Sequence, residues 1–413
     1  MYNKLVLIRA YTIFFFFVVG IGAGLNPFWD ENILIIKRPS NALWYLAAAG
    51  AVLHLPRWAK LKQRSTLTLA YLFFSMYSIG SLYWLERSEL LRGVNMLGLL
   101  LFFIPISYGI RFYAIEEQCA KFFVWGSLAT VGLLFYAQHF IAINTYGNID
   151  RFGMLVGLRG KLTNPNTVGS QMAIAALLTS LFLEQSLKKS WRYLLTGIFV
   201  LVSVWSGSRT VAIAMLLAYL YYYSSGRSRL PRLFYAIYGI ALLVLFAQYL
   251  PLEPFSLLIS RMTEIEEIAT LGDRTLIFPA FIEVITKNIE HLMFGVGVGG
   301  SWRALGETAI HESIKVGIEG IQRLSTHNGY MEIVINFGLV GTVLSLFLLK
   351  EIYARIRENV PVAEKYKIYA LMVFVAVISM GTVPFVQDWW YLVAVFILLG
   401  TYPCEEKNFE EEG

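Results

Sequence analysis

His327 lies where a polar stretch meets a long apolar run, in "STHNGYMEIVINFGLVG" (residues 325–341). The start of a helix disfavours the charged form of an imidazole, because the helix dipole is positive there. Ser325 and Thr326 precede the ring, and either can cap a helix N-terminus. We therefore predict a helix starting at His327, with a neutral ring that can act as a general base. The alternative is a structural ring bonded to a neighbouring carbonyl.

Basic side chains form the second set of candidates, because guanidinium groups bind phosphate oxygens bidentately. Arg209 lies in "SGSRT", a very short turn between two apolar runs, where an unbalanced charge is costly. If they converge, Arg209, Arg274, Arg159 and Lys161 would form an anion site. The alternatives are snorkelling of Arg209 to lipid headgroups, an ion pair between Arg274 and Asp273, and a solvated surface for the other two.

No metal or cofactor is predicted. None of the five histidines is four residues from another histidine or from a cysteine, and no EF-hand pattern is present. His139 is a second-rank catalytic candidate. The "GVGVGG" stretch (295–300) contains G-x-G-x-x-G, but an amphipathic helical pattern precedes it, whereas a dinucleotide fold requires a strand. We interpret these glycines as a tight turn.

The composition indicates an all-α polytopic membrane protein. Of the 413 residues, 57% are hydrophobic and only 15% are charged, whereas about a quarter of a soluble domain is charged. Recurrent apolar runs are long enough, or nearly so, to span a bilayer. They predict twelve transmembrane helices near 8–25, 41–55, 67–85, 93–110, 120–143, 165–184, 191–206, 209–223, 232–250, 327–349, 365–383 and 387–402.

Lysine and arginine gather in alternate loops, which predicts that these loops are cytoplasmic. The loops are 56–65, 184–192, 224–232 and 350–367. Both termini are then inside, and the candidate residues named above face outside. Because the basic charge is spread along membrane loops, nucleic acid is not an expected partner.

One long outer loop divides the chain into three parts. Helices one to nine occupy 1–250, the loop occupies 251–326, and 327–413 holds the last three helices with a cytoplasmic C-terminus. Apolar residues at helical spacing predict one amphipathic helix over 274–292. We expect a small folded cap on the membrane surface.

Five short motifs between residues 162 and 341 carry a resemblance to a known family, which covers roughly the second half of the chain. They are "LTNPNTVGS" (162–170), "SGSRT" (206–210), "GDRTLIFPAFI" (272–282), "MFGVGVGG" (293–300) and "HNGYMEIVINFGLVG" (327–341). Together they resemble the O-antigen ligase family, the ligase- and polymerase-like membrane glycosyltransferases of bacterial surface polysaccharides.

The resemblance implies a metal-independent inverting glycosyltransferase of the GT-C type, with a periplasmic active site in the bacterial inner membrane. Its donor would be a glycan on undecaprenyl pyrophosphate. His327 would match the histidine implicated in catalysis, and Arg209 and Arg274 the arginines that engage pyrophosphate. Arg159 or Lys161 would match a further basic residue, and the adjacent Asp273 and Asn328 would support the site.

Several acceptors and two other protein classes stay open. The acceptor would be lipid A-core for a ligase in lipopolysaccharide biosynthesis, another lipid-linked glycan for a polymerase, or a protein hydroxyl. We prefer the ligase, because the chain is compact with one dominant outer loop. A polysaccharide flippase is the main rival, but transporters place charges at the bilayer midplane, whereas these charges lie at helix ends. A membrane scaffold would explain neither the arginines nor His327.

Overall fold

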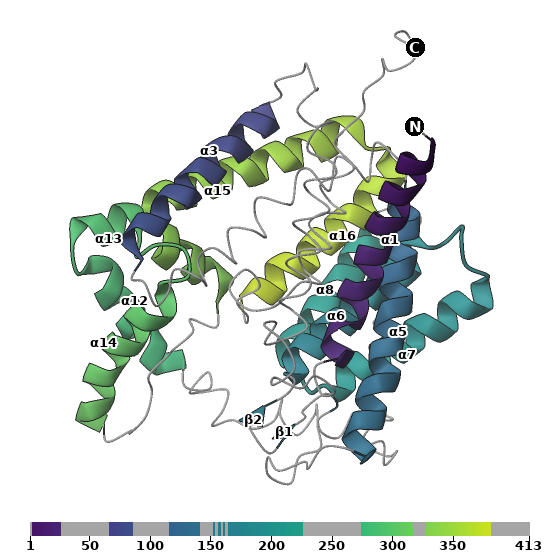
Figure 1. Cartoon of the computed structure of the whole chain (residues 1–413), viewed down its shortest axis with the longest axis horizontal. Helices are drawn as coiled ribbons and strands as arrows, with labels where there is room; N and C mark the ends of the chain where they lie inside the picture. Colours follow the sequence, from purple (N-terminus) through teal and green to yellow (C-terminus); the bar gives the residue numbers. More distant parts are fainter. Residues whose placement is uncertain are drawn as a thin grey trace.

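The computed structural model describes residues 2–25, 66–85, 115–140, 152, 156–157, 160–161, 164–225, 274–316 and 328–380. Apart from one hairpin, the regular elements in these ranges are helices (Figure 1). They are α1 (Tyr2–Leu25), α3 (Thr66–Gly80), η2 (Ser81–Trp84), α5 (Glu116–Phe140), α6 (Pro165–Leu177), η3 (Leu178–Phe182), α7 (Lys189–Trp205), α8 (Arg209–Ser224), α12 (Arg274–Thr286), α13 (Ile289–Phe294), α14 (Ser301–Val316), α15 (Gly329–Asn359) and α16 (Val362–Ser379). The hairpin joins β1 (Val156–Gly157) to β2 (Gly160–Lys161), antiparallel.

The predicted all-helical class is confirmed for the described residues, and each predicted span that falls on them has a helical counterpart. The match is close for α8, which ends one residue beyond the predicted 209–223, whereas α15 continues ten residues beyond 349. The spans predicted at 41–55, 93–110, 232–250 and 387–402 lie outside the described residues. Two helices, Glu116–His139 and Gly329–Glu358, are long and apolar enough to cross a membrane, among the residues described.

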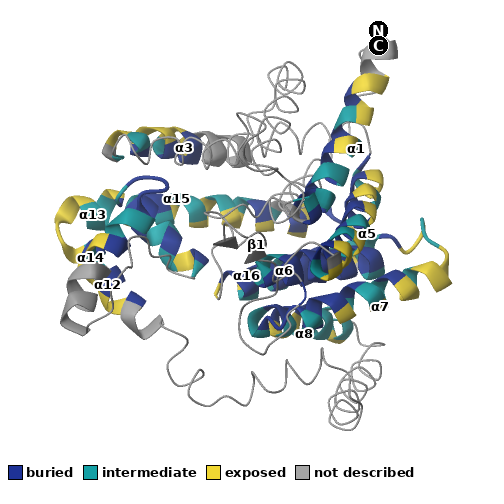
Figure 2. Cartoon of the chain, turned by 60° about the horizontal axis from the view of Figure 1, so that its bottom comes forward, coloured by how far each residue is buried: buried dark blue, intermediate teal, exposed yellow. Residues whose placement is uncertain are grey.

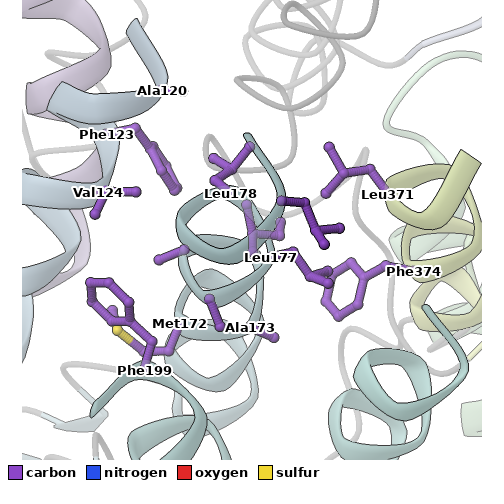
Figure 3. Packing of buried hydrophobic residues seen from close by; sticks show 14 of the residues in the cluster. Ala120, Phe123, Val124, Met172, Ala173, Leu177, Leu178, Phe199, Leu371 and Phe374 are labelled. Atoms are coloured by element: carbon purple, nitrogen blue, oxygen red, sulfur yellow. The ribbon is translucent and has the colours of Figure 1, made fainter. Parts of the chain in front are cut away.

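Helix α6 lies at the centre of the larger group of helices, with apolar neighbours on several sides. Met172 and Leu177 are fully buried in its length, and Phe123, Phe199 and Phe374 come from α5, α7 and α16 to surround them (Figure 3). A helix that is apolar around its circumference can be covered by lipid or by other helices, and small side chains favour other helices because they allow close approach. This explains why α6, with small residues such as alanine on its surface, packs at the middle of the group.

Helices α1 and α5 run parallel and approach closely through glycines. A Cβ on Gly20 would lie 3.0 Å from the Cα of Gly126, and one on Gly24 would lie 2.8 Å from the Cα of Thr130. The Thr130 hydroxyl donates a hydrogen bond to the Gly20 carbonyl at 2.7 Å, and the Gln171 side chain of α6 donates to the same carbonyl. Small residues joined by a few polar contacts are typical of helix packing inside membranes.

Large apolar side chains are exposed on the outer surfaces of several helices (Figure 2). Examples are Phe73 and Met76 of α3, Trp125 of α5, and Val343 and Leu346 of α15. Exposed apolar surface on this scale would be unfavourable in water and marks contact with lipid or protein. The surface therefore agrees with the membrane class inferred from composition.

Helices α12, α13 and α14 form a smaller group against the first half of α15 (Figure 1). Ala280 and Val284 of α12 and Leu305 of α14 bury against Ile335 of α15. The prediction of one helix over 274–292 is wrong: α12 ends at Thr286 and α13 begins at Ile289. The cause is Asn288, whose side chain accepts the His291 N–H at 2.7 Å and starts a new helix.

Candidate functional site

A glycine-rich turn over residues 295–300 is bound to the N-terminal part of α15. Gly295, Gly297 and Gly299 have φ of 77°, 88° and 87°, a region that side chains with a Cβ rarely adopt. The Val296 N–H donates to the Ile335 carbonyl at 2.8 Å, and the Gly297 N–H donates to the Asn336 carbonyl at 3.1 Å. Helix α13, not a strand, precedes the turn, so it is not a dinucleotide fingerprint.

Helix α15 is interrupted at Gly338 where it meets this turn. Gly338 has φ 62° and ψ −167°, and its Cβ position is 2.4 Å from the Met293 carbonyl carbon. The Tyr77 hydroxyl of α3 bonds the Phe337 carbonyl at 2.6 Å, which satisfies an acceptor that the interrupted helix cannot pair. The motifs "MFGVGVGG" and "HNGYMEIVINFGLVG" therefore form one unit, with α3 beside it.

Three buried polar residues, which we call the Asn336 cluster, hold this unit together. Ser301, Glu332 and Asn336 are 0%, 2% and 1% exposed. Asn336 Oδ1 accepts the N–H groups of Gly299 at 3.0 Å and Ser301 at 3.3 Å. Asn336 Nδ2 donates to Glu332 Oε1 at 3.2 Å, and the Ser301 hydroxyl donates to the same oxygen. Buried polar groups paired in this way fix one relative position of α14 and α15.

The first turn of α15 is capped by Asn328, so the expectation that Ser325 or Thr326 caps a helix starting at 327 is wrong. Asn328 Oδ1 accepts the N–H groups of Tyr330 at 3.0 Å and Met331 at 3.2 Å. Asparagine is among the best N-cap residues, and it lies two or three residues before the amides that it binds. His327, which lies outside the described residues, is joined directly to this cap.

Arg209 is the first residue of α8, and the turn before it is packed tightly. Gly207 has φ 64°, and the Ser203 hydroxyl donates to the Gly169 carbonyl at 3.0 Å. A Cβ on Gly169 would lie 2.1 Å from Ser206 Oγ. The "SGSRT" turn thus rests on α6, within the motif "LTNPNTVGS". Arg209 is partly buried, and its Nε is inaccessible to solvent.

Arg209 and the start of α15 lie at the same end of α16. The rings of Tyr221, near the end of α8, and Tyr369, early in α16, are 6.4 Å apart, and the two helices pack along their length. They are therefore antiparallel, and Arg209 lies toward the C-terminal end of α16. The Tyr330 hydroxyl, in the first turn of α15, donates to the Ala376 carbonyl in the last turn of α16 at 2.9 Å.

The other predicted site residues are placed only in part. Arg274 is the first residue of α12, and Lys161 lies in β2. Arg159 and Asp273 lie outside the described residues. His139 bonds the Phe135 carbonyl of its own helix through Nδ1 at 2.9 Å, which is a structural contact.

No group of three potential metal ligands occurs among the described residues. Inspection of the sequence missed the Asn336 cluster. The signal was present, since Glu332 and Asn336 are polar, lie four residues apart and therefore share one face of an otherwise apolar helix.

Comparison with known families gives one match, which spans residues 194–346 and whose description is O-antigen ligase. The matched segment includes Arg209, Arg274, His327, the glycine turn and the Asn336 cluster. The match confirms the resemblance inferred from the motifs for this part of the chain. A comparison with curated proteins finds no significant match.

Proposed function

Because residues 194–346 carry a domain of the O-antigen ligase family, we propose that this protein is an O-antigen ligase. It transfers a glycan from undecaprenyl pyrophosphate to a sugar of lipid A-core, at the periplasmic face of the bacterial inner membrane. This is a step of lipopolysaccharide biosynthesis.

The observation that supports this proposal best is the position of Arg209 relative to the start of α15. Both lie at one end of α16, so Arg209 and Asn328, the cap that follows His327 in the sequence, lie at the same end of the bundle. The amides of the first turn of α8 and its dipole also favour an anion there. A lipid-linked pyrophosphate is an anion held at this depth, next to a membrane surface.

The chemistry is a single displacement at the anomeric carbon of the donor sugar. The bond between this carbon and the pyrophosphate oxygen breaks, and a bond to the acceptor oxygen forms, so the configuration inverts. Arg209 and Arg274 balance the charge that grows on the leaving pyrophosphate. His327 takes the proton of the acceptor hydroxyl. No redox step or metal is needed for this balance.

The relative directions of four helices agree with the order of spans in the proposed topology. Helices α1 and α5 are parallel, as the first and fifth predicted spans must be. Helices α8 and α15 both run antiparallel to α16, so they share one direction. An odd number of crossings must then separate α8 from α15 if both span the membrane. The predicted span at 232–250 supplies that crossing.

The decisive test is transfer by the purified full-length protein in nanodiscs, with lipid A-core as acceptor, a lipid-pyrophosphate glycan as donor, no ATP, and a chelator present. The proposal predicts a glycosylated lipid A-core and released undecaprenyl pyrophosphate. Extension of the donor glycan alone would identify a polymerase instead. Glycan on an added protein would identify an oligosaccharyltransferase, and movement of intact donor across the bilayer a flippase.

The topology has its own test, by labelling single cysteines introduced at Ser256 and Glu411 after replacement of Cys119 and Cys404. We expect a membrane-impermeant reagent to label position 256 from the periplasm and position 411 only after the membrane is opened. Labelling of position 256 only from the cytoplasm would overturn the orientation and with it a periplasmic active site.

A further inference from the structure

A cavity of about 640 Å³ lies between α12, α13, α14 and the glycine turn. This volume is within the range of about 300–1,000 Å³ that is typical of ligand sites. None of the described residues that line it is assigned above to pyrophosphate binding or proton transfer. The polar residues among them are Glu283, Lys287, Glu290, His291, Arg303, Glu307 and Thr308.

The charges of the described residues around the cavity are nearly balanced. Three carboxylates, Glu283, Glu290 and Glu307, accompany two cations, Lys287 and Arg303. Arg303 Nε lies 3.4 Å from Glu307 Oε1, so part of its charge is already compensated. A pyrophosphate or another strong anion would be repelled by the carboxylates. The lining therefore favours a neutral ligand with many hydrogen-bonding groups.

His291 shows how the lining can supply both donors and acceptors. Its Nδ1 lies 3.1 Å from the Val284 carbonyl, and because a carbonyl only accepts, Nδ1 carries the proton. Lys287 and Arg303 supply further donors to the same lining, and its glutamates supply acceptors. The apolar part of the lining includes Leu85 and Val296. Donors and acceptors beside an apolar surface match a sugar, which has hydroxyl groups on its rim and C–H groups on its faces.

The cavity is held by the same contacts that position the start of α15. Gly300, which lines the cavity, belongs to the glycine turn that binds Asn336. Helices α12 and α14 pack on Ile335, and the partly buried Met331 packs against the same cluster. Met331 lies three residues after Asn328, in the first turn of α15. A ligand in the cavity would therefore be bound to the same rigid unit as the residues that follow His327.

We propose that this cavity is a saccharide subsite, which binds a few neutral sugar residues of a glycan used in the transfer reaction. The inference rests on the proposed function, because the reaction supplies the saccharide. Two glycans present this chemistry, the acceptor core oligosaccharide and the glycan of the donor. The cavity would hold sugars away from the reacting bond, so it contributes to binding and selectivity and not to the chemical step.

Direct binding can be measured without catalysis by saturation-transfer NMR on the full-length protein in nanodiscs. One arm uses free core oligosaccharide, and the other uses the donor glycan released from its lipid. We expect one of them to bind, and inorganic pyrophosphate not to displace it. Glu283→Ala with Lys287→Ala should weaken binding about tenfold or more, as expected when charge-assisted hydrogen bonds are lost. Both residues are exposed, so the variant should fold.

Two further variants complete the experiment. Thr308→Trp adds a large side chain on α14 that fills part of the cavity, so it should also weaken saccharide binding. It should raise KM for the glycan that binds there, with kcat little changed. Glu358→Gln removes an exposed carboxylate at the far end of α15 and should leave binding unchanged. Binding of neither saccharide, equal binding by all variants, or displacement by pyrophosphate would overturn the subsite. If the wild-type protein binds the saccharide but shows no transfer activity, the proposed function is wrong and the subsite stands.

Discussion

The side-chain oxygen of Asn336 accepts the backbone N–H of Gly299 at 3.0 Å, and this bond ties the glycine turn to the N-terminal part of α15. The two residues are 37 positions apart in the sequence and belong to two of the motifs on which the family resemblance rests. Their contact shows how these two motifs of the chain fit together. One supplies a backbone that only glycines can adopt, and the other supplies the polar side chain that binds it.

We predict that Asn336→Ala strongly destabilises the protein. The substitution leaves the N–H groups of Gly299 and Ser301 unpaired in a buried site and takes a donor from Glu332. Each unpaired buried group costs about 1–3 kcal/mol. Thermal unfolding in nanodiscs should show a clearly lower Tm. As a control, Asn288→Ala removes an exposed N-cap and should cost only about 1 kcal/mol. Equal effects of the two variants would contradict the role of the Asn336 cluster.

Gly338→Ala should prevent correct assembly of the glycine turn with α15. Its φ is 62°, and the added Cβ would meet the Met293 carbonyl at 2.4 to 2.5 Å, where the backbone cannot yield like a flexible side chain. We expect low yield or a loss of several kcal/mol, since strain and overlap act together. Gly197→Ala is the matched control, because that glycine is helical, exposed and has open space beside it. Normal thermal stability of Gly338→Ala would show that the interruption of α15 is not required.

Arg209→Ala should abolish most transfer while the protein stays folded. Loss of a charged hydrogen bond to a buried anion costs about 1.5–3 kcal/mol, so the rate should fall more than tenfold. Arg209→Lys should restore only part of it, because an ammonium cannot bind two oxygens in one plane. Arg274→Ala should behave alike. Arg357→Ala, an exposed charge at the other end of α15, is the control. Full activity in the Arg209 and Arg274 variants would remove pyrophosphate binding from their roles.

The apolar runs predicted helix positions well because burial in lipid requires long apolar segments with paired backbones. The bounds of α8 show this, since Arg209 and the following apolar residues leave little choice of start. Local polar signals were less decisive. The periodic pattern continues through 274–292, yet Asn288 stops α12 and starts α13, because a side chain that binds a backbone amide outweighs periodicity.

The sequence indicated which residues form the candidate site, but it indicated less about how they are positioned in space. Arg209 stood out because a charge beside the bilayer needs an explanation. The interruption at Gly338 could not be predicted from neighbouring residues, since the carbonyl of Met293 and the hydroxyl of Tyr77 determine it from distant parts of the chain. Asn328 could have been identified as the cap, but Ser325 and Thr326 satisfy the same rule.

Asn328 should act as a positioning residue. Asn328→Ala frees the N–H groups of Tyr330 and Met331, which costs about 1 kcal/mol and loosens the chain next to His327. We expect kcat to fall several-fold with little change in donor KM. Asn328→Asp and Asn328→Ser keep a capping oxygen and should restore most of kcat. A cap with only a structural role would lower the Tm of Asn328→Ala without a change in kcat, and cap-competent variants would then rescue Tm alone.

His327 carries the most specific chemical prediction. It precedes the cap of α15 in the sequence, and that cap lies at the end of the bundle where α8 begins with Arg209. We propose that the His327 ring acts at the pyrophosphate site. The positive end of the α15 dipole disfavours a charged imidazolium, which keeps the ring able to accept a proton at neutral pH. His327→Ala should therefore lower the transfer rate by about 10²–10⁴-fold, the usual contribution of a general base, while donor binding changes far less.

The decisive comparison is with His327→Gln, measured by single-turnover transfer at saturating donor. Glutamine keeps a hydrogen-bonding group at the same reach but cannot remove a proton, so it should not restore the rate. If it does restore the rate, the ring only orients the acceptor hydroxyl, and the proton leaves by another route. A lower Tm in both variants, with activity lost in proportion to unfolded protein, would assign His327 a structural role. If both variants fold normally and both lose rate, the His327 imidazole is the group that takes the proton.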